Sequence, residues 1–194
     1  AIKKFDELRS NWPQSPYSAE ARFMEGLARL KRKEYHEADV VFRETETNVP
    51  KFPRRWELDF YSGECYAQLR DYDAAVRYYG MALDAGKRRR DRADALRRCG
   101  DALYESGRLD SAATVYDRCL KEEERGKLRL DVAFKRGTIL EELKRYDEAL
   151  ALYASWKAFA FAEQREGELG LRTYACMARV GRTREAISGY QSLV

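Results

Sequence analysis

The chain repeats a short pattern of residues at a constant step of 37 residues. In each copy an alanine is followed four residues later by an aromatic residue, as at Ala38 and Phe42. The later copies are Ala75 with Tyr79, Ala112 with Tyr116, Ala149 with Tyr153 and, more weakly, Ala186 with Tyr190. An upstream glycine keeps the same step at Gly26, Gly63, Gly100 and Gly137, and Tyr174 stands at the fifth place. A fixed step of this size indicates a stack of structural repeats and constrains the fold more than any local pattern does.

Each repeat contains two stretches that have the pattern of helices. In the third copy, the first stretch runs from Ala93 to Gly107 and the second runs on to Glu124. The second stretch places its apolar residues at helical spacing and not in the alternation of a strand. Gly107 suits the left-handed position that ends a helix, and Asp110 suits the cap of the next one. The four prolines all fall between repeats, so each repeat is predicted to be an antiparallel helix pair, helix A followed by helix B.

The small residues at recurring positions predict how the two helices meet. Glycine on helix A and alanine on helix B allow a close approach, and the aromatic residues fill the space between neighbouring pairs. One pair alone cannot bury its apolar face, so the pairs must stack. The expected fold class is therefore all-α.

The glycine, tyrosine, alanine and aromatic residues at these spacings resemble the tetratricopeptide repeat (TPR) family. The stretches AEARFMEGLARLKRKEYHEADVVF and ADALRRCGDALYESGRLDSAATVY follow its pattern closely, and the resemblance covers nearly the whole chain. It implies a right-handed α-solenoid of antiparallel helix pairs that acts as a protein-interaction scaffold. The chain departs from the family in its step, since the usual repeat has about 34 residues. It also departs where the family has an early tryptophan in helix A: this position holds Arg22, Asp59, Leu96, Ala133 and Gly170.

We expect a single TPR array over residues 1–194. Residues 1–16 are predicted to be the second helix of a truncated repeat, and complete repeats are predicted at 19–55, 56–92, 93–129 and 130–166, followed by an incomplete repeat at 167–194. Both ends of the chain interrupt a unit, and neither resembles the polar cap that such stacks need. The expectation is a segment of a longer array, or an ordered region that stops at these points. Self-association through the open repeat ends stays an open alternative for the partner.

A second resemblance is confined to NWPQSPYSAEA, residues 11–21. A helix ending in Trp-Pro, followed by Ser-Pro-Tyr and a helix that opens on small residues, is similar to bacterial envelope TPR proteins. These are the BamD-like outer-membrane assembly lipoproteins and the periplasmic coordinator associated with the Tol system. The similarity implies an alternative function as a structural or assembly arm of a bacterial envelope complex. The compartment stays open between the cytoplasm and the bacterial periplasm.

Composition argues against several classes of function. Charged residues make up 36% of the chain but the net charge is only +4, which does not mark nucleic acid as a general partner. No apolar run approaches the roughly 20 residues that span a bilayer. The four cysteines form no CxxC pair and the single histidine is His36, so metal sites and Cys–His catalytic pairs lack partners. No phosphate-loop or triad pattern appears, and we predict a non-enzymatic protein without cofactor or metal.

If the chain is a TPR stack, helix A lines a concave groove, and the residue types there predict its ligand. Acidic residues recur at one helix A position, and phenylalanines recur three residues later, with Arg97 in one copy. Such a surface suits a peptide or partner domain with basic and apolar side chains. The alternatives are that the acids complement the helix dipole and that the phenylalanines belong to the core. The predicted groove residues are Glu20, Phe23, Leu27, Glu57, Phe60, Glu64, Asp94, Arg97, Asp101, Tyr104, Asp131, Phe134 and Glu141.

The sharpest charge run is KRRRDR, residues 87–92. One interpretation is a contact with an anionic ligand, either nucleic acid or lipid. The other is a solvated turn whose cations complement the end of a helix, and it is favoured because no aromatic residues are interleaved with the basic ones. The residues of this predicted anion patch are Lys87, Arg88, Arg89, Arg90 and Arg92.

Overall fold

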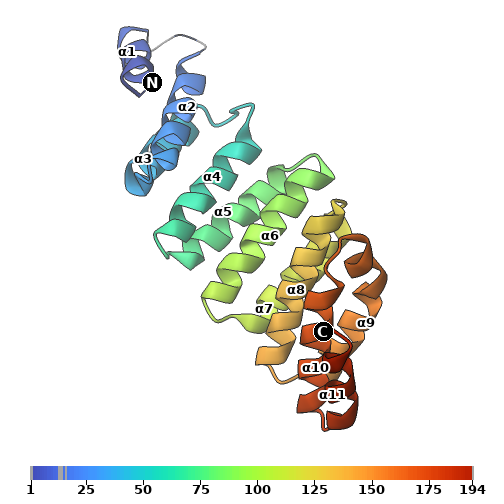
Figure 1. The fold of residues 1–194 in the computed structure, drawn as a ribbon. Coiled ribbons are helices and arrows are strands. Elements are labelled where there is room, and N and C mark those ends of the chain that lie inside the picture. The colour runs from blue at the N-terminus through green and yellow to red at the C-terminus, as the bar shows by residue number, and fades with distance from the viewer. Residues whose placement is uncertain (1, 13–14, 16, 194) are drawn as a thin grey trace. The chain divides into compact units, whose positions relative to one another are not determined.

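The structure is a computed structural model that describes residues 2–12, 15 and 17–193. All regular secondary structure within these residues is helical (Figure 1). The helices are α1 (Ile2–Asn11), α2 (Ser18–Lys31), α3 (Tyr35–Asn48), α4 (Arg55–Gln68), α5 (Tyr72–Ala85), α6 (Arg89–Glu105), α7 (Leu109–Glu122), α8 (Gly126–Glu142), α9 (Tyr146–Ala162), α10 (Glu166–Arg179) and α11 (Thr183–Gln191). The all-α prediction is therefore confirmed. Three positions of the proline-rich segment 11–21, namely Pro13, Gln14 and Pro16, lie outside the described residues.

The chain divides into two compact units, residues 1–106 and 107–194. Unit 1 holds α1 to α6, and unit 2 holds α7 to α11. In unit 1, α2 packs on α3 and α4 packs on α5, and α3 and α5 each also contact the following helix. In unit 2, α8 packs on α9 and α10 packs on α11. Within the units, α2–α3, α4–α5, α8–α9 and α10–α11 form the predicted A–B pairs, and α6 follows the same order as a helix A. The residue boundaries of the repeats remain a prediction.

The turn between helix A and helix B has the same backbone conformation in every repeat. One residue of each turn has a positive φ, and these residues follow the step of 37: Lys33 (63°), Arg70 (61°), Gly107 (76°), Lys144 (57°) and Gly181 (82°). A left-handed residue at this point ends helix A. The prediction for Gly107 is confirmed, and the three basic residues adopt the same conformation at a cost of about 1–2 kcal/mol each.

The predicted cap at Asp110 is wrong. Helix α7 begins at Leu109, and no side chain caps its first turn. Asp110 lies inside that turn and its carboxylate is 3.6 Å from Arg145, an exposed ion pair within unit 2. The acidic residue therefore complements the positive end of the helix and does not accept a capping bond.

Close contact between helix A and helix B explains the recurring glycine. A Cβ added to Gly63 would lie 2.7 Å from ring atoms of Tyr79, which is nearer than any side chain can tolerate. A Cβ at Gly26 would overlap Phe42 and a Cβ at Gly137 would overlap Tyr153 in the same way. The ring of helix B therefore rests directly on the backbone of helix A, and only glycine leaves the space.

The last helix pair reaches the same contact with the two partners exchanged. Tyr174 occupies the glycine position on α10, and Gly189 lies opposite it on α11. A Cβ at Gly189 would overlap the ring of Tyr174, and Tyr174 also makes an edge contact with Tyr190 at 5.5 Å between centroids. The missing glycine of the fifth repeat is thus compensated on the facing helix.

Candidate functional site on the helix A surface

An arginine in the turn before α4 connects two neighbouring helices A in unit 1. Arg54 Nη1 donates a hydrogen bond to Glu20 Oε1 on α2 at 2.5 Å, and Nε donates to Glu57 Oε1 on α4 at 2.8 Å. The guanidinium carbon also lies 4.4 Å from the ring centroid of Phe23. We call this arrangement the arginine bracket: one cation pairs with the recurring acid of two successive helices A and covers the phenylalanine between them.

The same bracket occurs in unit 2, three repeat steps further along the chain. Arg165 pairs with Asp131 on α8, and its Nε and Nη2 donate to Glu168 Oε2 on α10 at 2.9 and 2.7 Å. Its guanidinium carbon lies 4.7 Å from the ring centroid of Phe134. Charge-assisted bonds of this kind are about twice as strong as neutral ones, so the bracket stabilises the contact between helices A.

The arginine brackets determine what part of the predicted groove is accessible. Phe23 is fully buried and Phe134 is 4% exposed, so both rings fill the interior, as the core alternative anticipated. The recurring acids Glu20, Glu57, Asp131 and Glu168 are half-buried and paired with arginine. A ligand would therefore meet these acids already neutralised.

Four other predicted groove residues also make contacts within the protein. Leu27 packs against the core of unit 1. Phe60 stacks on Trp56, with 5.1 Å between ring centroids. Asp94 and Arg97 form an ion pair at 3.5 Å along α6. The more accessible surface lies further along the helices A, towards their C-terminal ends.

A cleft of about 290 Å³ opens there in unit 1, between α4, α5 and α6. We call it the unit 1 cleft. It contains two of the predicted groove residues, Glu64 and Asp101, and Tyr104 lies half-buried one turn further along α6. The lining residues are Glu64, Ala67, Gln68, Tyr72, Tyr79, Arg98, Asp101, Ala102 and Glu105.

A tyrosine, a carboxylate and an arginine form the floor of the unit 1 cleft. The hydroxyl of Tyr79 donates to Glu64 Oε1 at 2.6 Å, and Arg98 Nε lies 3.1 Å from the same oxygen. Burial, and after it the charge of Glu64, raise the pKa of Tyr79 above its ordinary value. The phenol therefore stays protonated and keeps donating, while the carboxylate is held by this hydrogen bond and by its ion pair with Arg98.

Unit 2 has a cleft of about 280 Å³ at the corresponding place, between α8, α9 and α10. We call it the unit 2 cleft. Every one of its lining residues lies 74 residues, or two repeat steps, after a residue that lines the unit 1 cleft. The lining residues are Thr138, Glu141, Glu142, Tyr146, Ala175, Cys176 and Arg179.

Glu141, which lines the unit 2 cleft, is held by the same kinds of partners as Glu64 but comes from a different position, and these partners lie behind the cleft lining. Tyr153 donates to Glu141 Oε1, and Arg172 lies 3.8 Å from that oxygen. The position equivalent to Glu64 is Thr138, whose hydroxyl accepts a bond from Arg172 at 2.9 Å. The carboxylate has thus moved one helical turn, to the place that Ala67 holds in unit 1, while its tyrosine and arginine partners kept their positions.

Cys176 contributes a thiol to the unit 2 cleft but little surface, being 1% exposed. Burial, followed by the nearby Glu141, raises the pKa of this thiol to about 11. A thiol with a raised pKa is a poor nucleophile at neutral pH. Among the described residues, no cluster of acidic, histidine or cysteine side chains could hold a metal ion.

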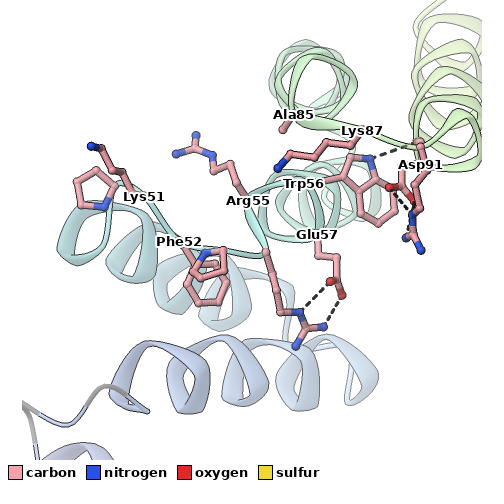
Figure 2. Close-up of a pocket in the computed structure, with 12 residues that line it drawn as sticks. Lys51, Phe52, Arg55, Trp56, Glu57, Ala85, Lys87 and Asp91 are labelled. Atoms are coloured by element: carbon pink, nitrogen blue, oxygen red, sulfur yellow. Dashed lines mark hydrogen bonds and ion pairs between the residues drawn. The ribbon is translucent and has the colours of Figure 1, made fainter.

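The predicted anion patch has a structural partner that the sequence did not reveal. Arg88 is paired with Asp91, and Arg92 Nη1 donates to the backbone oxygen of Lys87 at 3.3 Å. Trp56, more than thirty residues away in the chain, lines a cleft together with Lys87 and Arg88 (Figure 2). Lys87, Arg88, Arg89 and Arg90 are exposed, and Arg92 is half-buried.

The partners of the cleft carboxylates recur at multiples of the repeat step in the sequence. Tyr79 and Tyr153 are separated by 74 residues, as are Arg98 and Arg172. Both spacings are twice the repeat step. A search for polar residues at whole multiples of the step would have selected these residues, as it would Arg54 and Arg165.

The chain was compared with protein families, with curated protein sequences and with solved structures. The profile of one protein family, described as tetratricopeptide repeat, matches residues 23–88, 66–124 and 100–163. No curated protein sequence matches the chain significantly. Among the described residues, none of the helices has the length and apolar composition needed to cross a bilayer.

Several solved structures share the fold at low sequence identity. One is YrrB, a TPR protein with an unusual peptide-binding site: it is 15% identical, with a TM-score of 0.72 over 100% of this chain and 92% of that one. MamA is 12% identical, with a TM-score of 0.75 over 92% and 91% of the two chains. A tetratricopeptide repeat protein from Parabacteroides merdae ATCC 43184 is 13% identical, with a TM-score of 0.70 over 100% and 71%. These similarities confirm the predicted fold class, a TPR-like solenoid of helix pairs.

Proposed function

Because the chain belongs to the tetratricopeptide repeat family, we propose that it is a scaffold for protein–protein interaction. Each unit binds a peptide segment with basic and apolar side chains in its helix A cleft. The observation that carries the proposal is the recurrence of the unit 1 and unit 2 clefts at equivalent positions, each lined by a carboxylate that a tyrosine and an arginine contact. A stack that needed only stability would not require an opening at the same place in both units.

The charges of the clefts support a basic ligand. Glu64, Asp101 and Glu105 line the unit 1 cleft against a single cation, Arg98. Glu141 and Glu142 line the unit 2 cleft together with Arg179, and Arg172 lies 3.8 Å from Glu141 behind the lining, so the acidic excess is clearer in unit 1. Complementary charge of this kind accelerates association and rejects acidic competitors. The tyrosine and the arginine hold one carboxylate rigidly in each cleft, which lowers the entropy lost on binding.

The test uses peptides selected against the intact chain from a displayed random library. Glu105→Lys reverses an exposed charge in the unit 1 cleft, and Ala175→Trp fills the unit 2 cleft from an exposed position on α10. Each is expected to weaken peptides bound in its own cleft by about tenfold or more, which corresponds to ~1.4 kcal/mol. Isothermal titration calorimetry measures the dissociation constants.

Matched controls lie on the helices B of the same units. Asp84→Lys on α5 and Ala151→Trp on α9 make the same chemical changes at exposed positions outside the clefts. They should leave affinity unchanged. Peptides that bind the cleft variants as tightly as the controls would show that the clefts are not the binding sites. Glu57 and Glu64 are unsuitable for this test because both hold the structure together.

The envelope-arm alternative stays a prediction from the sequence, because no contact within either unit favours it over peptide binding.

A further inference from the structure

Unit 1 contains a larger cleft away from the helix A clefts, between the α3–α4 loop and the α5–α6 linker (Figure 2). We call it the loop cleft: it is lined by residues 50–57, Ala85, Lys87, Arg88 and Asp91, and has a volume of about 630 Å³. We propose that the loop cleft is a second binding site, which takes an acidic peptide segment that also carries an apolar side chain.

The wall of the loop cleft is preformed. Trp56 Nε1 donates a hydrogen bond to the backbone oxygen of Asp91 at 3.2 Å, and its ring stacks on Phe60. The linker fits tightly against this wall, since a Cβ added to Gly86 would lie 3.1 Å from Cδ1 of Trp56. Phe52 in the opposite loop is 4% exposed and contacts Phe23 at 5.5 Å between centroids. A ligand would therefore meet a surface that needs little ordering before it binds.

Cations outnumber acids in the lining of the loop cleft. Five cations line it against two acids, Glu57 and Asp91. Three of the cations are arginines that are already paired: Arg54 with Glu20 and Glu57, Arg55 with Asp59 and Glu46, and Arg88 with Asp91. The other two are lysines, Lys51 and Lys87.

The two lysines are the available charges. Both are exposed, and neither forms an ion pair within the part of the chain that the structure describes. Figure 2 shows Lys87 extending past Trp56 towards the side of the cleft where Arg55 lies, with Lys51 on the α3–α4 loop. Because neither charge is neutralised within the protein, both are available to attract an anionic ligand.

The state of the donors favours carboxylates over phosphates or bases. Each arginine already uses its planar fork on a carboxylate, so none offers the bidentate geometry with which arginine recognises phosphate. Lysine acts as a point charge that pairs with a carboxylate or a phosphate without bidentate geometry. Base stacking would need open aromatic faces, but Phe52 is buried and Trp56 stacks on Phe60. Pro50, Pro53 and Ala85 leave an apolar lining beside the charges.

The test measures binding of a fluorescent peptide of glutamate and leucine residues by anisotropy, against the full chain. Lys51→Glu combined with Lys87→Glu should weaken binding by about tenfold or more. The matched control is Lys127→Glu with Lys157→Glu, which changes the net charge equally at exposed lysines of unit 2. It should bind as the unaltered protein does. Circular dichroism of both double variants should show unchanged helix content.

Three outcomes would overturn the proposal. The first is no measurable binding of the peptide to the unaltered chain. The second is an equal loss in the control variant, which would reveal only general charge attraction. The third is tighter binding of a single-stranded oligonucleotide of the same charge, lost in the Lys51 and Lys87 variant. Peptides selected for the helix A clefts should bind this variant normally, so the two sites succeed or fail separately.

Discussion

A glycine and an aromatic ring determine how closely helix A and helix B approach in each pair. The ring of Tyr79 rests on the backbone at Gly63, and in the last pair Tyr174 rests on Gly189 with the roles reversed. The requirement therefore belongs to the pair of facing residues and not to one position. This explains why the fifth repeat can carry tyrosine where the first four carry glycine.

We expect Gly63→Ala to destabilise the protein. Its Cβ would lie 2.7 Å from the ring of Tyr79, and overpacking of this kind costs about 1–3 kcal/mol. Alanine gains about 1 kcal/mol over glycine inside a helix, so the net loss should be up to roughly 2 kcal/mol in the free energy of unfolding measured with urea.

The control for this substitution lies on the facing helix. A Cβ added to Gly80 on α5 meets nothing within 4 Å, so Gly80→Ala should stabilise the protein by up to about 1 kcal/mol. If both substitutions stabilised the protein, the contact between Gly63 and Tyr79 would not limit the approach of α4 and α5.

At the scale of helices, the arginine brackets decide how successive helices A contact each other. Arg54 and Arg165 sit in equivalent turns and each joins two acids from neighbouring helices. The recurring acids looked like groove residues or helix-dipole partners in the sequence. They have a third role, because the arginine that pairs with two of them comes from the turn between repeats.

Sequence patterns predicted the helices well and the contacts between repeats poorly, for a physical reason. The step of 37, the glycines and the left-handed turn at Gly107 are local or periodic features, and periodicity can be counted. Arg54 and Glu20 are 34 residues apart, and their meeting depends on how one pair stacks on the next. In unit 2 the tyrosine and arginine contact Glu141 of α8, which is equivalent to Ala67 and lies one helical turn after the position equivalent to Glu64. Alignment of equivalent positions cannot detect this change.

We expect Arg165→Met to destabilise unit 2. It removes charge-assisted bonds to Asp131 and Glu168 and leaves two acids facing each other beside Phe134. Net contributions of hydrogen bonds to charged groups are about 1.5–3 kcal/mol, and partial exposure lowers the expected loss to roughly 1–2 kcal/mol. Thermal unfolding followed by circular dichroism at 222 nm, a helix signal, measures it.

Arg145→Met is the comparison for Arg165→Met. Arg145, just before α9, pairs with Glu148 three residues away and lies 3.6 Å from Asp110 on α7, with all three side chains exposed. Exposed pairs contribute about 0–1 kcal/mol, so the melting temperature should change little. Equal losses in the two variants would mean that the bracket contributes no more than an ordinary surface ion pair.

At the scale of the whole chain, the two units carry related but separately built sites. Each has a helix A cleft of similar size, lined by a carboxylate that a tyrosine and an arginine contact. Unit 1 adds the loop cleft. In repeat proteins each helix pair contacts mainly its neighbours, so stability is approximately a sum of local terms. A substitution in one unit should therefore lower the stability of that unit more than the stability of the other.

Gly137→Ala tests how far a disturbance spreads. Its Cβ would overlap Tyr153, which also donates to Glu141 in the lining of the unit 2 cleft. Hydrogen–deuterium exchange should accelerate in α8 and α9, because overpacking costs about 1–3 kcal/mol against the roughly 1 kcal/mol that alanine gains in a helix, and a net loss of ~1.4 kcal/mol gives a factor of ten. Exchange in α2 to α5 should stay close to that of the unaltered protein, since local opening requires only the disrupted pair to unfold. Equal acceleration in both units would instead show that the chain unfolds as one cooperative body, and the arginine brackets and glycine contacts would then stabilise the whole array and not single pairs.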